Sequence, residues 1–300
     1  MLVESGQTFE GSNPSSTATL LWKELFMKIL ITGSRGYVGY NLIQYLQRHA
    51  PDIELIGLDS TFKELSKKSK DKLRHDHVLD IPQIDDSILE ADLPLDVTHV
   101  IHLAGRTGVR QSWNAEELKS YYVDNVLSTQ RIFNVYTRPP YKTDIPILYS
   151  TSSSVKEMKS PYAMTQAMKE AIAPGTAIGM RFFTIWGGEY PRSDMLYAKA
   201  RAGSLEELTD NKRDFTHIRY VCESIYALLL STNPEKFFGR KLNIYDIGTG
   251  HPRTPKEFLE DEDILSPTQL NNLPIVKKTD ESQITKADPT EIEKIRKAFL

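Results

Sequence analysis

A glycine-rich segment near the start of the chain has the spacing of a dinucleotide-binding loop. In Thr32-Gly33-Ser-Arg-Gly36-Tyr-Val-Gly39 the glycines follow an apolar strand pattern and open a helical one. Glycine lets the backbone turn tightly and approach a pyrophosphate, while the helix start supplies free N–H groups. Asp59 stands about 20 residues further on, where a carboxylate accepts from ribose hydroxyls and repels a 2′-phosphate. These residues predict NAD rather than NADP; the alternative is a tight turn with no ligand.

Other chemistry is sparse. Cys222 is the only cysteine, so an internal disulfide and a cysteine-based zinc cluster are both excluded. His75 and His77 form the one close histidine pair, and a solvated connector is the simpler interpretation of that spacing. We therefore expect no metal site.

Composition narrows the range of partners. The 300 residues carry 37 basic and 40 acidic side chains, a formal net charge of −3. This balance offers no basic stripe for nucleic acid or an anionic membrane, and no apolar run approaches the roughly 18 residues of a membrane span. Residues 1–26 lack the basic and apolar regions of a secretory signal and are expected to be a flexible leader. We expect a cytoplasmic protein that binds small molecules.

The elements that must position the glycine loop alternate between short apolar runs and helical patterns. Strands are expected at 28–32, 53–59, 77–81, 98–104, 145–150, 179–185 and 242–247, and helices at 36–47, 115–136 and 220–231. Because parallel neighbours need long crossovers, this alternation predicts a Rossmann-type α/β fold, a doubly wound parallel sheet with helices on both faces. Residues 27–178 are expected to form the NAD-binding domain, 179–250 to add to its sheet, and 186–300 to form most of a small substrate lobe. Asp80, after the third strand, is a candidate adenine contact or helix cap.

With these residues in place, the chain resembles the extended short-chain dehydrogenase/reductases, and among them the NAD-dependent nucleotide-sugar epimerases. The resemblance runs from about residue 28 to residue 288. Several of its motifs look most like 4-epimerases acting on UDP-glucuronic acid. It rests on His102-Leu-Ala-Gly105, Gly108-Val-Arg110-Gln-Ser112, Tyr122-Val-Asp-Asn125-Val, Ser150-Thr-Ser152-Ser-Ser-Val155, Pro161-Tyr162, Arg181-Phe-Phe-Thr184, Arg192-Ser-Asp194-Met195, Arg213-Asp-Phe-Thr216 and Thr285-Lys-Ala-Asp288.

The resemblance implies an assignment for each site residue. Tyr162 would exchange the proton of the sugar 4-hydroxyl, and Ser152 would hydrogen-bond that oxygen and the developing ketone. On spacing alone, a serine-rich loop and a packing tyrosine are equally good interpretations. The substrate contacts would be Arg110, Asn125, Ser152, Ser153, Thr184, Arg192 for a hexuronate carboxylate, and Arg213 for the UDP diphosphate. The cofactor contacts would be Gly33, Arg35, Gly36, Tyr37, Val38, Gly39, Asp59, Ser60, Asp80, Ile81, Leu103, Ala104, Gly105, Tyr162 and Gln166.

One position departs from the family pattern. Relatives carry Tyr-x-x-x-Lys, in which the lysine holds the nicotinamide ribose and lowers the pKa of the tyrosine, but Gln166 stands four residues after Tyr162. Glutamine can hydrogen-bond ribose but supplies no charge. Lys169 lies about 10 Å further along the helix axis than Tyr162, which predicts that it is too far away to substitute directly.

Two functions follow from this resemblance. The first is an NAD-dependent 4-epimerase of a nucleotide sugar, UDP-glucuronic acid or UDP-galacturonic acid, working through a transient 4-keto intermediate. The second is a protein that binds NAD and a nucleotide sugar but has lost turnover with the motif lysine. The sequence Thr151-Ser152-Ser153 lacks the acidic pair of the dehydratases in this family, which disfavours dehydration. By resemblance, helices at 115–136 and 162–173 would pair in a homodimer.

Overall fold

The computed structural model describes residues 27–60, 75–78, 81, 92–137, 145–232, 243–278 and 282–300, with only the backbone for 75–78. The expected leader and Asp80 lie outside these residues. None of the helices in the described part of the chain is long and apolar enough to cross a membrane.

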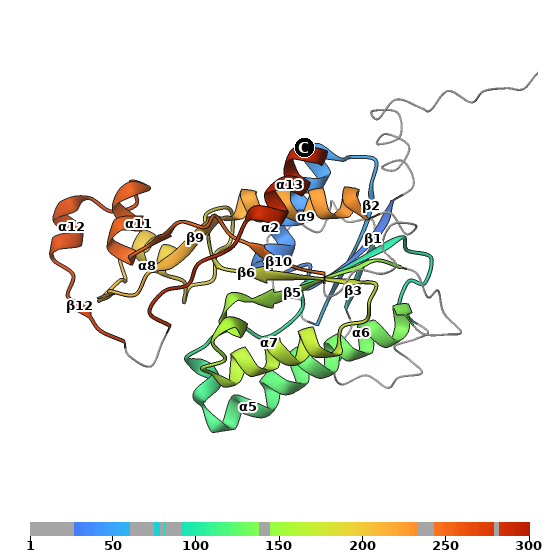
Figure 1. The fold of residues 1–300 in the computed structure, drawn as a ribbon, viewed down its shortest axis with the longest axis horizontal. Coiled ribbons are helices and arrows are strands. Elements are labelled where there is room, and N and C mark those ends of the chain that lie inside the picture. The colour runs from blue at the N-terminus through green and yellow to red at the C-terminus, as the bar shows by residue number, and fades with distance from the viewer. Residues whose placement is uncertain are drawn as a thin grey trace, which may run out of the picture.

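A seven-stranded parallel sheet forms the centre of the molecule (Figure 1). Its order across the sheet is β10 (Ile244–Ile247), β6 (Ala177–Phe182), β5 (Ile147–Ser152), β4 (His99–His102), β1 (Lys28–Thr32), β2 (Glu54–Asp59) and β3 (His75–Val78). Central strands such as β1 are apolar without alternation because both sheet faces are covered. The strand order reverses between β1 and β4, the crevice where doubly wound folds bind ligands. The predicted doubly wound α/β fold is confirmed.

Pairing shifts one strand from its expected place. The strand expected at 77–81 is β3, which lies at His75–Val78 because its residues pair with Ile56 to Asp59 of β2. The histidine pair expected in a connector therefore belongs to an edge strand.

Two layers of helices cover the sheet (Figure 1). One face carries α2 (Tyr37–His49), α9 (Ile218–Ser231) and α13 (Thr290–Phe299). The other face carries α5 (Ala115–Tyr121), α6 (Ser128–Thr137) and α7 (Pro161–Ile172). The apolar side chains on each face form a separate core, one built around Leu42 and Leu228 and the other around Ile132 and Tyr149.

The single helix expected at 115–136 is divided by a π-helical turn, η2 (Tyr122–Leu127). Within it the Asn125 amide donates to the Arg106 carbonyl oxygen (3.1 Å) and to Thr165 Oγ1 (2.9 Å). Its Oδ1 accepts from the Arg106 N–H (2.7 Å). The widened turn thus aims one polar side chain at the loop after β4 and at α7, a use typical of π-bulges near functional sites.

The C-terminal lobe lies beyond the carboxyl ends of the strands (Figure 1). It consists of short elements around the stacked rings of Phe215 and Phe258, whose centroids are 3.9 Å apart. The elements are β7 (Thr184–Trp186), α8 (Leu196–Arg201), β8 (Leu208–Thr209), β9 (Arg213–His217), β11 (Pro252–Arg253), α11 (Pro255–Asp261), α12 (Pro267–Asn271) and β12 (Ile275–Val276).

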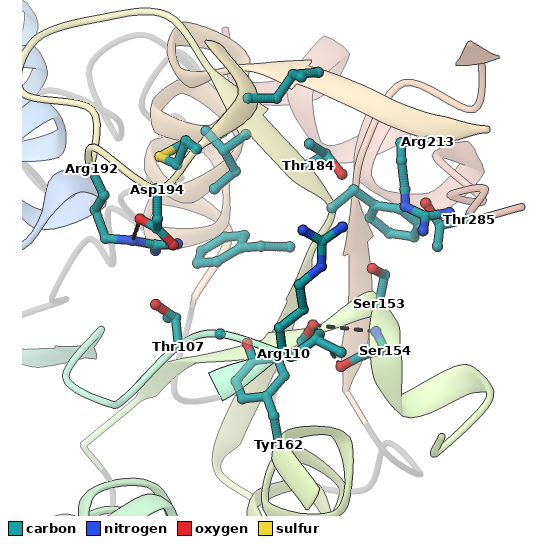
Figure 2. Close-up of a pocket in the computed structure, with 18 of the residues that line it drawn as sticks. Thr107, Arg110, Ser153, Ser154, Tyr162, Thr184, Arg192, Asp194, Arg213 and Thr285 are labelled. Atoms are coloured by element: carbon teal, nitrogen blue, oxygen red, sulfur yellow. Dashed lines mark hydrogen bonds and ion pairs between the residues drawn. The ribbon is translucent and has the colours of Figure 1, made fainter. Parts of the chain in front are cut away.

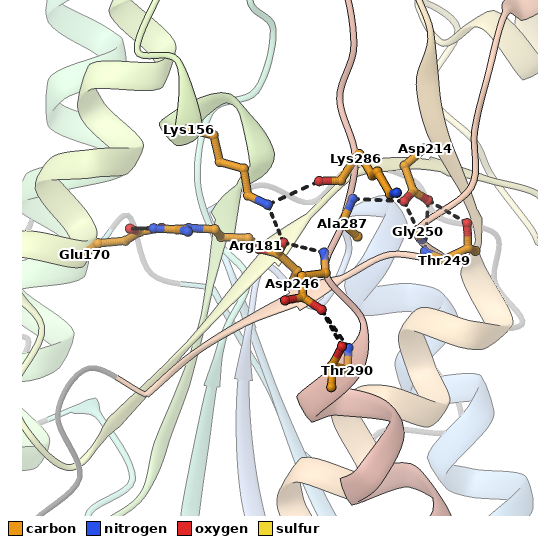
Figure 3. Close-up of polar contacts among 11 residues, drawn as sticks. Lys156, Glu170, Arg181, Asp214, Asp246, Thr249, Gly250, Lys286, Ala287 and Thr290 are labelled. Carbon is orange, nitrogen blue, oxygen red and sulfur yellow. Dashed lines mark hydrogen bonds and ion pairs between the residues drawn. The ribbon is translucent and has the colours of Figure 1, made fainter.

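Asp214, which is fully buried in β9, ties the lobe to the sheet (Figure 3). Its carboxylate accepts from the backbone N–H groups of Thr249 (2.9 Å), Gly250 (2.7 Å) and Ala287 (3.1 Å). Nearby, Asp246 of β10 pairs with Lys156 and accepts from the Asp288 N–H. These two carboxylates, by accepting from backbone N–H groups, hold the irregular segment before α13 against the sheet.

Candidate active site

The glycine loop between β1 and α2 leaves no space for side chains. Gly33 has φ +69°, and a Cβ there would lie 2.7 Å from the Ala104 nitrogen. A Cβ on Gly39 would lie 2.2 Å from the Gly33 carbonyl oxygen. These contacts bring the loop and the ends of β1 and β4 together, so the backbone itself forms the floor of the crevice.

The polar groups around this loop fit a dinucleotide. Ser34 Oγ is buried, and within the described residues it has no hydrogen-bond partner. Helix α2 begins after Gly36 with no side-chain cap, which leaves N–H groups of its first turn for an anion. Asp59, at the end of β2, accepts from the Arg35 N–H (3.0 Å) and the Ser60 N–H (2.9 Å). The expected pyrophosphate and ribose groups are therefore matched by donors and a carboxylate.

The remaining expected cofactor contacts lie near the end of β4 or next to the loop. The Leu103 and Ala104 N–H groups donate to Thr32, and Gly105 follows in a positive-φ conformation. Tyr37 donates from its phenol to the Gly187 carbonyl oxygen (2.7 Å). Ile81 is buried and its carbonyl oxygen accepts from Arg131.

A cavity of about 900 Å³ lies between the sheet and the C-terminal lobe. This volume is in the range of cofactor and substrate sites. Most of the residues assigned by resemblance to chemistry or substrate line it, together with several cofactor contacts. The expected residues in its wall are Tyr37, Val38, Leu103, Gly105, Arg110, Ser152, Ser153, Tyr162, Gln166, Thr184, Arg192 and Arg213.

Tyr162 and Ser152 meet in this cavity, each at the end of an element. Ser152 ends β5, and Tyr162 is the second residue of α7, whose start is fixed by Pro161 and by the Ser160 cap. The Ser160 hydroxyl accepts from the Ala163 N–H at 3.1 Å. Burial raises the pKa of the Tyr162 phenol, while its hydrogen bond with Ser152 and the charge of Arg192 lower it. In the protein without ligand, the raised pKa thus favours the protonated phenol, which cannot act as a base.

Gln166 and Lys169 follow Tyr162 on the same face of α7. Both are buried and both line the cavity. The Lys169 ammonium approaches Ser150 Oγ at 3.4 Å, and burial lowers its pKa to about 7. The axial distance from Tyr162 predicts that Lys169 is too far away to replace the motif lysine. The structure nevertheless places Lys169 in the cavity wall.

The arginines lie on different sides of the cavity (Figure 2). Arg192 forms a two-point pair with Asp194, from Nε to Oδ1 (3.0 Å) and from Nη2 to Oδ2 (3.1 Å). Opposite it, Arg213 donates to the Ser282 carbonyl oxygen and lies beside Thr285. Arg110 reaches into the space between them, above Tyr162. These three arginine side chains therefore line one cavity, an arrangement that suits an anionic substrate.

The other expected substrate contacts divide into two groups. Thr184 at the start of β7 and Ser153 at the start of the short 3₁₀ turn η3 (Ser153–Lys156) line the cavity. Asn125 does not line it: the residue is fully buried, and its amide holds the loop after β4 as described above. Its place in the structure is one layer behind the cavity wall.

Several further lining residues receive no role from the sequence. Most come from loops or from short elements of the lobe, whose positions depend on long-range pairing. Lys169, on α7, could have been found in advance, because a spacing of seven residues repeats on one face of a helix. Polar examples are Thr107, Lys169, Lys199, Glu206, Thr209, Ser282 and Thr285.

Comparison with known proteins decides the family. Residues 29–248 match the model of the NAD dependent epimerase/dehydratase family. The chain belongs to this family. A member of the epimerase/dehydratase family uses NAD, in agreement with the predicted cofactor.

Two curated relatives show how far the sequences of this family have diverged. Protein CapI of Staphylococcus aureus is 28% identical over 284 residues, with 78% of this chain and 82% of that protein aligned. An uncharacterized UDP-glucose epimerase of Bacillus subtilis, YtcB, is 28% identical over 238 residues, covering 68% and 72%.

Solved structures of nucleotide-sugar enzymes share the fold of this chain. UDP-glucuronic acid 4-epimerase from Bacillus cereus, in complex with UDP-glucuronic acid and NAD, matches with a TM-score of 0.70 at 22% identity over 90% of this chain and 93% of that one. A dTDP-glucose 4,6-dehydratase from Bacillus anthracis, in complex with NAD, matches with a TM-score of 0.69 at 20% identity, covering 89% of each chain. Epimerases and dehydratases thus match the fold equally well, and the choice between them depends on the site.

Proposed function

We propose that this protein is an NAD-dependent 4-epimerase of a UDP-hexuronic acid, interconverting UDP-glucuronic and UDP-galacturonic acid. The observation that carries the proposal is the meeting of Tyr162 and Ser152 in a cavity with arginines on opposite sides. A UDP-hexuronate has two separate anionic groups, the diphosphate and the sugar carboxylate. Its C4 hydroxyl is on the ring carbon next to the one that carries the carboxylate, and the charge of Arg192 likewise acts on Tyr162.

In this proposal the side chains move a proton and hold an oxygen. Bound NAD supplies a reversible hydride acceptor. Tyr162 takes the proton of the sugar 4-hydroxyl and later returns it. Ser152 donates a hydrogen bond to the same oxygen, most strongly as it becomes the ketone of the 4-keto sugar. The keto sugar then turns over in the cavity, so that reduction on its other face gives the epimer.

Arg192 has an edge left for a carboxylate. Its pair with Asp194 uses Nε and one Nη2 hydrogen, and among the described residues no further partner of this guanidinium is found. A guanidinium has five N–H donors, so the Nη1–Nη2 edge can receive a second carboxylate in the bidentate manner. Asp194 then fixes the plane of the guanidinium, and Arg213 is left to bind the diphosphate.

The residues at the end of β5 favour epimerisation over dehydration. Dehydration needs an acid and a base at C5 and C6, but this strand ends in Thr151 and Ser152 and is followed by Ser153. Thr151 is buried and donates to Glu170 (2.9 Å), which is itself paired with Arg181. Glu170, the carboxylate that Thr151 contacts, is thus engaged in a structural pair.

Product analysis tests this function. The purified chain with NAD is incubated with UDP-glucuronate at pH 7 to 10, and the nucleotide sugars are separated by anion exchange. We expect slow conversion to UDP-galacturonate that is lost in Tyr162→Phe, whose sugar affinity should remain close to that of the wild type. If neither the wild type nor Gln166→Lys forms the epimer, the epimerase proposal is rejected.

A second function is supported by Gln166. With no cation at that position and a phenol whose pKa is raised by burial, the chain could bind NAD and the nucleotide sugar without turnover. Calorimetry separates the two proposals: tight binding of both ligands with no product after hours would establish the binding protein.

We also propose a homodimer through α5 and α7. These helices lie side by side on one face of the molecule (Figure 1). Their exposed residues include large apolar side chains: Leu118, Met164, Met168 and Ile172. Exposed apolar residues gathered on neighbouring helices are typical of a subunit interface.

A further inference from the structure

Lys169 is the one lysine of helix α7, and it is 1% exposed. A buried ammonium is costly unless its donors are satisfied. Within the described residues it makes a single hydrogen bond, the long contact of 3.4 Å to Ser150 Oγ. An ammonium has three donors, so two lack a partner among those residues. The group therefore needs acceptors that the described part of the chain does not supply.

The adjacent carboxylate does not fill this need. Glu170 Oε1 accepts from Thr151 (2.9 Å) and from Arg181 Nε (2.8 Å), and Oε2 accepts from Arg181 Nη2 (2.6 Å). Figure 3 shows Glu170 directed at Arg181. Because α7 turns successive side chains about 100° apart, Lys169 faces the cavity while Glu170 faces β5 and β6.

The direction of helical side chains explains how Lys169 reaches the cofactor side of the cavity. Side chains on a helix lean toward its N-terminus, and a lysine can cover about one turn, roughly 5.4 Å. The ammonium of Lys169 therefore lies over the level of Gln166. It is 3.9 Å from the point that a Cβ on Gly105 would occupy, and Gly105 follows the strand that adjoins the glycine loop.

These positions identify the acceptors. The pyrophosphate belongs at the glycine loop. The nicotinamide must lie near Tyr162, because the hydride leaves C4 of the sugar while the proton leaves the hydroxyl oxygen on that carbon. The ribose that joins the two must lie between them. Gly105 and Ser150, the neighbours of the ammonium, line the same cavity as Tyr162. We propose that Lys169 binds the hydroxyls of the nicotinamide-side ribose of NAD, and that it supplies from one turn further along α7 the cation missing at Gln166.

This inference deepens the proposed function but depends on it only for the cofactor. It is tested without any sugar, by calorimetric titration of the full chain, freed of nucleotide, with NAD, ADP-ribose and ADP. NAD and ADP-ribose contain the second ribose, whereas ADP ends at the diphosphate. If the protein showed no turnover of a nucleotide sugar, the epimerase proposal would be rejected, but these three nucleotide titrations would still test the role of Lys169.

For Lys169→Met we expect NAD and ADP-ribose to bind roughly 10- to 100-fold more weakly, the range for a hydrogen bond to a charged group, and ADP to bind as it does to the wild type. Lys294→Met, on the exposed surface of α13, is the matched control and should change none of the three affinities. If ADP binding were weakened as much as NAD binding, the ammonium would lie at the phosphates. If only NAD binding were weakened, it would lie at the nicotinamide. Either result, or three unchanged affinities, overturns the proposal.

A charge-relocation variant provides a second readout that a structural lysine would not affect. In Gln166→Lys/Lys169→Met the ammonium enters the same space from one turn earlier, so NAD and ADP-ribose affinity should return to within about threefold of the wild type. Should Lys169→Met not fold, Lys169→Gln keeps a donor without the charge, and the same three titrations apply. Failure of the double variant to recover ADP-ribose binding contradicts the assignment.

Discussion

Replacing Lys169 by methionine should stabilise the protein free of ligand while weakening its hold on NAD. Burial lowers the pKa of Lys169 from 10.5 to about 7. That difference of roughly 3.5 pKa units corresponds to about 5 kcal/mol of cost for the charged form. Methionine has a similar length and needs no donors satisfied, so at pH 6 we expect a gain of about 1–4 kcal/mol, the range observed when buried charges are replaced by apolar residues.

The dependence on pH distinguishes this effect from better packing. Below pH 7 the lysine is charged in the folded and the unfolded protein, and the folded state carries the full cost. Between pH 7 and 10.5 only the unfolded state keeps the proton. The free energy of unfolding of the wild type therefore rises with pH by up to about 1.4 kcal/mol per unit, and the advantage of Lys169→Met should shrink accordingly.

The groups that face Lys169 are engaged in pairs of their own or carry no charge. On its own helix Glu170 is paired with Arg181. On β4, burial lowers the pKa of His102 well below its usual value. Thr129 donates to the Asn125 carbonyl oxygen (2.6 Å), so His102 Nε2 must donate to Thr129 and Nδ1 must accept from Thr32, as a neutral imidazole does. From η2 the neighbour is the uncharged Asn125 amide.

The assay is urea denaturation of both proteins at pH 6, 7, 8 and 9 without NAD, with Lys294→Met as the control. Taking the difference between wild type and variant cancels other titrations, such as those of buried tyrosines. A difference that stays flat from pH 6 to 9, or a methionine variant less stable than the wild type at pH 6, would refute the reasoning that Lys169 is held at a cost for a ligand.

Three further predictions follow from named contacts. Gln166→Lys should lower the pKa of Tyr162, by as much as roughly 3 units for a charge at 4 Å, and move the rising limb of the pH–rate profile toward neutral pH; an unchanged profile would show that charge at residue 166 does not reach the phenol. Asp214→Ala leaves three backbone N–H groups without their acceptor and should cost about 3–5 kcal/mol in urea denaturation, whereas a loss under 1 kcal/mol would mean that water replaces the carboxylate. Met168→Glu should convert the proposed dimer to a monomer in light scattering, with Lys294→Met again as the control, and a dimer of unchanged mass would exclude α7 from the interface.

The central sheet could be predicted from sequence because its signals are local. Apolar runs such as 28–32 and 53–59 mark the strands, and the glycine loop marks the first crossover. The substrate lobe could not be predicted in the same way. Strands of two residues, such as β8 and β12, exist only through pairing across more than 60 residues, which no local pattern records. The break in the helix at 115–136 likewise depends on partners of Asn125 elsewhere in the chain.

The site shows a related limit, one of side-chain direction rather than backbone placement. Counting 1.5 Å per residue separates Lys169 from Tyr162 by about 10 Å and correctly describes the helix axis. The functional atom is the ammonium, however, and in our proposal it reaches back by about one turn toward the level of Gln166, in the wall of the same cavity. A sequence motif records which residue occupies one position, whereas the binding of a cofactor depends on where the charged atom lies in space. Gln166 is therefore weak evidence of lost function as long as Lys169, buried and short of acceptors, faces the same cavity.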